Sequence, residues 1–146
     1  MSRHFTLPEA ESLLSAVEKN LREALSVKAQ YQEAEEFLQS LAQRVMLMGG
    51  VVLDREGIRD MRAQRDESGE RLKAVMEQLQ EIGCLVKDLD TGLVDFPTLF
   101  RGEEVYLCWK LGETAITFWH GVSEGFAGRK PIDQDFLDHH RGDATN

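Results

Sequence analysis

The sequence is poor in cysteine and has no long apolar run. Only two cysteines, Cys84 and Cys108, occur among 146 residues, and their spacing fits neither a disulfide framework nor a zinc motif. No apolar stretch approaches the ~20 residues that a membrane-spanning helix needs. The first residues, MSRHFTLPEAESLL, contain acids where a signal peptide would have a basic start and a continuous apolar segment. These absences predict a reduced, cytoplasmic protein that does not enter a membrane.

Basic residues are also in deficit. The chain has 17 Lys and Arg against 26 Asp and Glu, which gives a formal net charge of -9. Binding to nucleic acid or to an anionic membrane surface needs clustered positive charge, so the charge balance argues against both partners. Hydrophobic residues make up 42% of the chain, enough for a globular core at this length. We expect a single domain over 1–132 and a mobile acidic tail over 133–146.

Prolines are few, and the first of the three marks the start of a helix. Thr6 can cap this helix, Pro8 suits its first turn, and Glu9 completes a capping box. Nothing interrupts the helical pattern before a Gly-Gly pair. The sequence therefore predicts one helix over about 7–48 and a second over about 54–82.

Both predicted helices carry an apolar seam with a polar middle part. If they fold back antiparallel, Glu35 faces Arg65 or Ser68, and an ion pair there would fix the register of the two helices. Alternatively, these polar positions are solvated gaps in a loose seam. The polar breaks, which include Lys28, weaken an interpretation of the chain as a coiled-coil scaffolding protein.

From residue 84 the apolar period changes from helical to two. The segments CLVKDL, LVDF, EVYLCWKL and ITFWH predict four short antiparallel strands over about 84–120. The predicted fold is therefore α+β. It is a long antiparallel helical hairpin with a small antiparallel β-sheet of three to five strands packed at its open end.

The stretch VKDLDTGLVDFP admits two interpretations. Its Asp-Thr-Gly triplet at 90–92 is also found in aspartic proteases, which need two such carboxylates on an all-β body. About half of this chain is predicted helix, and charged residues interrupt the apolar run before the triplet. We therefore favour a β-hairpin in which Gly92 takes the left-handed conformation and closes a three-residue turn. The strand pairs predicted by this turn are Leu89 with Leu93, Lys87 with Asp95, and Val86 with Phe96.

Cys108 and His120 have the residue types of a nucleophile and its base. Whether they can meet depends on the loop between their strands, because side chains alternate between the two faces of a sheet. We favour an even loop length, which pairs Cys108 with Trp119 and places His120 on the opposite face with Trp109. Only an odd loop length brings Cys108 and His120 together. With the even loop, Cys108 is a buried structural residue beside Tyr106, on a face that serves as a dimer interface or ligand floor unless the C-terminal loop covers it.

His120 is also a candidate metal ligand, together with His4 and an acid such as Asp95 or Glu124. A histidine at the edge of a core more commonly makes only hydrogen bonds. We therefore predict no cofactor and no metal, and retain His4 and His120 as candidate ligands. Arg129 is a candidate anion clamp, although a structural ion pair with the acids of 88–95 is favoured.

The segments VKDLDTGLVDFP, YLCWKLGE, FWH and GFAGRKP, after a helical hairpin opened by RHFTLPEAESLL, resemble an uncharacterised prokaryotic family, the domain of unknown function number 2203. The similarity runs from about Arg3 to Pro131. The resemblance implies no particular activity, but it places shared function at the sheet end. The family pattern falls on Lys87, Asp88, Gly92, Asp95, Phe96, Pro97, Cys108, Trp109, Gly112, Glu113, Trp119, His120, Gly125, Gly128, Arg129 and Pro131.

These observations leave two main functional hypotheses. The first is a small binding or interaction module that acts through the sheet end, as a homodimer or with another protein partner. The second is a small enzyme or a metal- or ligand-binding protein with a polar pocket near His120, Asp95 and Arg129, which would leave a small-molecule ligand possible. We favour binding over catalysis because no complete catalytic constellation is present. The candidate binding surface consists of Asp88, Asp95, Tyr106, Cys108, Trp109, Glu113, Trp119, His120 and Arg129.

Overall fold

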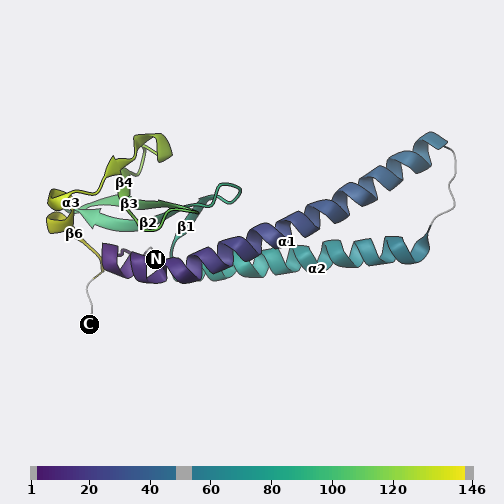
Figure 1. Ribbon diagram of the computed structural model, residues 1–146, viewed down its shortest axis with the longest axis horizontal. Helices are drawn as coiled ribbons and strands as arrows, with labels where there is room; N and C mark the ends of the chain where they lie inside the picture. Colours follow the sequence, from purple (N-terminus) through teal and green to yellow (C-terminus); the bar gives the residue numbers. More distant parts are fainter. Residues whose placement is uncertain (1–2, 49–53, 144–146) are drawn as a thin grey trace. The chain divides into compact units, whose positions relative to one another are not determined.

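The computed structural model describes residues 3–48 and 54–143. Two long helices, α1 (Leu7–Met48) and α2 (Arg55–Ile82), occupy the first part of the chain (Figure 1). Both predicted helices are confirmed, and their bounds agree with the prediction to within one residue. The predicted capping box is also present, because Thr6 Oγ1 accepts from the backbone N–H of Glu9 and Glu9 Oε1 accepts from the backbone N–H of Thr6. The Gly-Gly pair lies outside the described residues.

The chain divides into two compact units, and one of them interrupts the other in the sequence. The sheet unit consists of Met1–Leu21 together with Gln78–Asn146, and the arm consists of Arg22–Glu77. Among the described residues, no helix is both long and apolar enough to cross a membrane.

Within the arm, α1 and α2 run antiparallel, as predicted. Glu23 pairs with Arg71 near one end, and further along the arm Glu35 Oε1 lies 3.7 Å from Arg65 Nε. The prediction that Glu35 faces Arg65 is therefore confirmed. Ser68, the alternative partner, is buried and donates to backbone oxygens of its own helix.

The sheet is antiparallel and has six strands. Four strands correspond to the predicted ones, and two additional strands of two residues each come from the C-terminal part of the chain. The strands are β1 (Leu85–Asp88), β2 (Leu93–Phe100), β3 (Glu103–Lys110), β4 (Phe118–Gly121), β5 (Lys130–Pro131) and β6 (His140–Arg141). Strands β1 to β5 follow one another in space, and β6 pairs with β2 beyond the end of β1.

The turn between β1 and β2 confirms the hairpin but corrects its register. Gly92 has a φ of 69°, the left-handed conformation that was predicted, and its N–H donates to Leu89 O. A bulge at Lys87 shifts the pairing, so that Asp95 lies opposite Leu85 and not opposite Lys87. The predicted Lys87–Asp95 pair is therefore wrong. The bulge frees the Asp95 carboxylate for a different partner.

One face of the sheet belongs to the core of the sheet unit. Phe96 on β2 meets Phe5 edge to face, with ring centroids 5.4 Å apart, and the Phe5 N–H donates to Pro97 O at 2.7 Å. Leu107 and Trp109 of β3 are buried on the same face, as predicted. The other buried apolar residues of this unit include Ala10, Val17, Leu21, Leu79, Val94 and Val105.

Residues 133–143 form α3 (Gln134–His139) and β6. The Asp133 side chain caps α3 by accepting from the Phe136 N–H. Phe136 is fully buried and stacks on Phe100 and Trp119, with ring centroids 4.9 and 5.0 Å away. This aromatic contact and the pairing of β6 with β2 hold a strongly polar segment against the sheet.

Candidate functional site

The register of β3 and β4 brings Cys108 and His120 to the same face of the sheet. Cys108 pairs with Phe118 and Tyr106 pairs with His120, so all four side chains share one face. The loop between β3 and β4, residues 111–117, has an odd number of residues. The predicted even loop is wrong, and with it the prediction that Cys108 pairs with Trp119.

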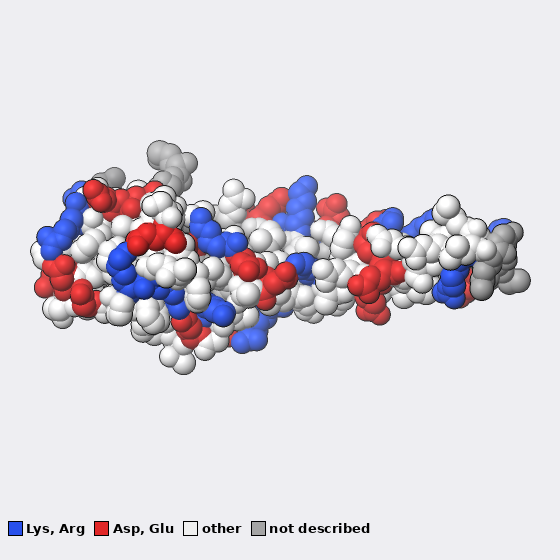
Figure 2. Space-filling model, turned by 90° about the horizontal axis from the view of Figure 1, so that it is seen from above, with Lys and Arg blue, Asp and Glu red and all other residues white. Residues whose placement is uncertain are grey.

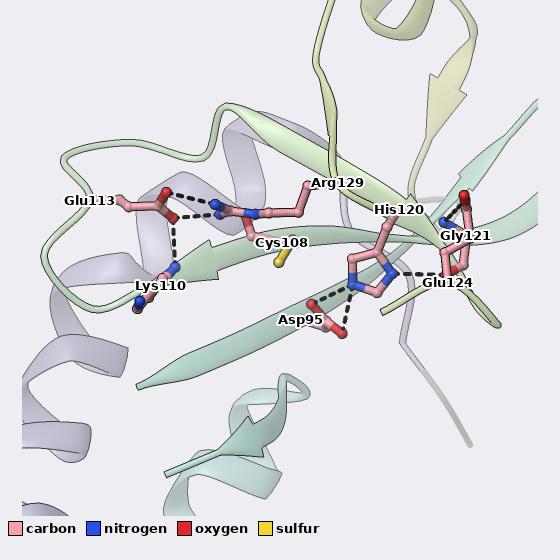
Figure 3. Close-up of polar contacts among 8 residues, drawn as sticks. All are labelled: Asp95, Cys108, Lys110, Glu113, His120, Gly121, Glu124 and Arg129. Carbon is pink, nitrogen blue, oxygen red and sulfur yellow. Dashed lines mark hydrogen bonds and ion pairs between the residues drawn. The ribbon is translucent and has the colours of Figure 1, made fainter. Parts of the chain in front are cut away.

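Asp95 completes this group from the neighbouring strand. It pairs with Cys108 across β2 and β3, and His120 Nε2 lies 3.0 and 3.1 Å from its two carboxylate oxygens (Figure 3). One ligand atom from each of Asp95, Cys108 and His120 lies within 4.8 Å of the others. The three residues are 1%, 0% and 3% exposed. We refer to them as the buried cluster.

The hydrogen bonds of His120 define where its protons lie. Its Nδ1 is 2.8 Å from Gly121 O, and a carbonyl oxygen only accepts, so Nδ1 carries a proton. Its Nε2 faces the Asp95 carboxyl group, and one further proton must lie between them. Wherever that proton resides, the Asp95–His120 pair has no net charge. Its burial therefore costs much less free energy than the burial of an unpaired charge.

Cys108 is a protonated thiol at neutral pH. Burial raises its pKa to about 11, and the charge of Asp95 acts in the same direction. Arg129 opposes this shift but does not cancel it. A thiol in this environment is a poor nucleophile in the free protein, which argues against a catalytic Cys108–His120 pair.

Beside the cluster, Arg129 and Glu113 form a bidentate ion pair. Arg129 Nη2 and Nη1 lie 2.6 and 3.0 Å from the Glu113 carboxylate oxygens, and Nη2 also donates to Cys108 O at 3.2 Å. The guanidinium packs against the rings of Phe118 and Phe126, 4.3 and 4.6 Å from their centroids. The predicted structural ion pair of Arg129 is thus present, but its partner is Glu113 and not an acid of 88–95.

Glu113 is also held by the backbone. Burial raises the pKa of its carboxyl group, but hydrogen bonds from Arg129 and from the Lys110 N–H outweigh this effect and hold the pKa below its usual value. The Glu113 backbone oxygen accepts from Trp109 Nε1. These bonds tie the β3–β4 loop to both faces of the sheet and so stabilise the odd register.

The predicted aromatic surface is not exposed as one face. Tyr106 is only 9% exposed, with its ring against that of His120 at 5.5 Å, and Lys87 Nζ lies 5.0 Å from the Tyr106 ring. Trp119 lies on the opposite face of the sheet, where it contacts Phe136. On the face that carries Tyr106 and Cys108, the sheet therefore holds a buried polar cluster.

Two other predicted site residues lie outside the cluster. Asp88 is exposed and accepts from the N–H of Asp90 in the hairpin turn. His4 does not join His120, because its Nε2 and Nδ1 contact Glu104 and Asp143 at 3.0 and 3.2 Å. Glu124, the alternative acid predicted beside His120, accepts from the N–H of Gly121.

Sequence reasoning missed two features of the site. The sequence predicts Cys108 as a nucleophile or a structural residue but not as a metal ligand, and it does not predict the contact of His120 with the backbone oxygen of Gly121. The first follows from loop parity, since an odd loop places Cys108, His120 and Asp95 on one face. The second had no sequence signal, because every residue carries a carbonyl group.

Comparison with known proteins gives a family but no activity. No curated protein and no solved structure shows significant similarity to the chain. A family model described as "Uncharacterized conserved protein (DUF2203)" matches residues 3–132. This match covers the whole buried cluster and the Glu113–Arg129 pair, and the chain belongs to that family.

Proposed function

We propose that the protein binds a divalent transition-metal ion through the buried cluster. The cluster supplies one carboxylate, one thiol and one imidazole, and their ligand atoms lie within 4.8 Å of one another. Thiolate and imidazole favour transition metals over magnesium and calcium, and Zn²⁺ is commonly held by these three ligand types. The meeting of three different ligand types in one buried place is the observation that carries the proposal.

The ligand atoms require only small movements. Around tetrahedral Zn²⁺, with bonds of about 2.0–2.3 Å, ligand atoms lie roughly 3.3–3.6 Å apart. Asp95 Oδ1 and His120 Nε2 lie 3.0 Å apart, which is a hydrogen-bond distance, and these two atoms would move slightly apart when a metal binds. The Cys108 sulfur lies at most 4.8 Å from the ligand atoms of Asp95 and His120, and it would move closer to them.

The charges also fit. A divalent ion bound to a carboxylate, a thiolate and a neutral imidazole forms a group without net charge, which suits a buried position. Binding would displace two protons, the one between Asp95 and His120 and the one on the Cys108 thiol. The metal thus replaces protons that the cluster already holds, and no further charge has to be buried.

The surroundings of His120 support the same role. Metal-binding histidines typically donate their second ring N–H to a carbonyl or carboxylate oxygen, which orients the other nitrogen toward the metal. The bond from Nδ1 to Gly121 O does this for Nε2. Three protein ligands leave a fourth coordination position, which a water or a small ligand would fill. This proposal departs from our expectation of a protein without a cofactor.

Metal titration of chelator-treated protein tests the proposal. We expect one equivalent of Zn²⁺ to bind, and Co²⁺ to produce the absorption bands of a thiolate-ligated ion. At a free metal concentration of 100 times the Kd, the melting temperature should rise by roughly 5–10 °C. Cys108→Ser should abolish the thiolate band and weaken binding strongly.

Cys84→Ser provides the matched control. Cys84 is also buried, and burial raises its pKa to about 11 as well, but it is not part of the cluster. It should bind Zn²⁺ like the wild type, as should His4→Gln. Absence of Zn²⁺ and Co²⁺ binding by the wild type, or equal binding by Cys108→Ser, would refute the proposal.

A further inference from the structure

The outer part of the arm, residues 35–47 and 54–67, has no buried side chain among those that the structure describes. Ala34 in α1 and Ser68 in α2 are the last buried residues before it. Beyond them, large apolar side chains reach solvent, and Met46 and Leu47 are each 85% exposed. Figure 2 shows uncharged atoms at the surface close to the end of the arm, with charged groups beside them.

Two helices that bury no side chains between them are expected to be unstable on their own. Helices in water gain most of their stability by packing an apolar face, and a helix pair that buries nothing has little to hold it together. The outer arm nevertheless keeps the apolar period of its inner part, with Leu38, Leu41 and Val45. A further packing surface is therefore needed, and the charges on this part of the arm indicate its chemistry.

Two neighbouring grooves lie on one side of the arm. The first, the basic groove, has a volume of about 440 Å³ and is lined by five apolar side chains of α1 and by Ile58, Arg62 and Arg65 of α2. The second, the acidic groove, has a volume of about 420 Å³ and is lined by Tyr31, Glu35, Arg65, Asp66, Gly69 and Glu70. Arg65 lines both grooves, so they adjoin each other.

The helix positions confirm that both grooves open on the same side. In α1, Tyr31 and Glu35 of the acidic groove and Leu38 and Ala42 of the basic groove follow one another at spacings of three or four residues. Such spacings place side chains on one face of a helix. Along this single face, a basic and apolar region is thus followed by an acidic one.

We propose that a second copy of the chain packs antiparallel on this face of the arm. In a two-fold arrangement whose axis passes near the Glu35–Arg65 pair, the basic groove of one copy meets the acidic groove of the other, and the reverse contact occurs by symmetry. Arg62 of each copy lies opposite Glu70 of the other. Four helices then enclose the apolar side chains that line the basic groove of each arm.

The charges favour a second copy over other occupants. Nucleic acid or an anionic membrane would suit Arg62 but would be repelled by the carboxylates of Asp66 and Glu70 on the same face. A second arm matches both signs at once. Among the described residues, neither Arg62 nor Glu70 has an ion pair within the chain, so both are free for such contacts.

Analytical ultracentrifugation of the full-length protein over a range of concentrations tests this proposal. We expect a monomer–dimer equilibrium for the wild type. Arg62→Glu and Glu70→Arg should each raise the dimer Kd at least about fivefold, because each turns two attractive contacts into repulsive ones. Circular dichroism should show that both variants keep their helix content.

Mixing the two variants distinguishes charge pairing between copies from damage to the fold. In a mixed dimer both contacts again join opposite charges, so an equimolar mixture of Arg62→Glu and Glu70→Arg should recover the wild-type Kd. Arg59→Glu, a charge reversal outside both grooves, should leave the Kd unchanged. A wild type that is monomeric at every concentration overturns the proposal, and so does a dimer that neither charge reversal weakens.

Discussion

Asp95 and His120 are side-chain partners although their strands are not neighbours. Strand β3 lies between β2 and β4, and His120 Nε2 reaches Asp95 Oδ1 over it at 3.0 Å. The bond thus ties three strands together on a face that the apolar core does not occupy. Loss of this bond should lower the free energy of unfolding even when no ligand is bound.

In metal-free protein, Asp95→Ala should be more damaging than Asp95→Asn. Removing the carboxyl group leaves the buried Nε2 of His120 without a partner, which should lower the free energy of unfolding by about 1–3 kcal/mol. An asparagine amide can donate to the same nitrogen, so Asp95→Asn should cost only about 1 kcal/mol. Urea denaturation measures both values. Equal losses for the two variants would contradict the hydrogen-bond role given to Asp95.

The Glu113–Arg129 pair should make stability depend on acid pH. The folded protein holds the Glu113 pKa below the usual 4.5, so the pair stabilises the fold above that pH. This contribution is lost as the pH falls through the folded-state pKa. The difference in melting temperature between wild type and Glu113→Gln should therefore be largest near neutral pH and should shrink below about pH 4.5. Glu103→Gln, at an exposed position, should show no such trend.

Gly92→Ala should destabilise the β1–β2 hairpin. The residue has a φ of 69°, and a Cβ atom would lie 2.4 Å from Leu111 Cβ. Backbone strain and this clash together should cost about 2–4 kcal/mol. Gly102→Ala is the matched control, since Gly102 also has a positive φ but faces open space. Thermal unfolding should show a clearly smaller loss for Gly102→Ala, and similar losses would mean that the contact with Leu111 is unimportant.

Phe136→Ala should release the C-terminal segment. The ring is fully buried between Phe100 and Trp119, so its removal should lower stability by about 3–5 kcal/mol. Hydrogen exchange should accelerate over 133–143 more than elsewhere in the sheet unit. Leu137→Ala, at a neighbouring position that is 39% exposed, should change little. Unchanged exchange in Phe136→Ala would show that other contacts hold the segment.

The helical part of the fold could be predicted well because its signals are long and repeated. The capping box at Thr6, the uninterrupted apolar period and the opposition of Glu35 and Arg65 each follow from spacing alone. The turn at Gly92 was equally readable, because few residues other than glycine accept its backbone conformation. These features depend on residues that are close in sequence or in helical register.

The sheet could be predicted only in outline because its register depends on single residues. One extra residue at Lys87 moves Asp95 away from its predicted partner, and one residue in the 111–117 loop decides which face His120 occupies. The loop contains no turn motif that would fix its length in advance. Folding of 133–143 likewise depends on Phe136 meeting rings that are distant in sequence. The sequence therefore identifies Asp95, Cys108 and His120 as candidate site residues but does not predict that the three side chains meet.

The position of the arm in the sequence has a consequence for how this protein can vary. Residues on both sides of it are joined directly, since Phe5 N–H donates to Pro97 O and Leu7 N–H donates to His140 Nε2. The arm is thus an insertion into a unit that closes on itself. Matched deletions of whole turns from its two helices would remove none of these bonds and none of the cluster residues. The length of the arm and the chemistry of the cluster are encoded separately, so mutation can change either one and preserve the other.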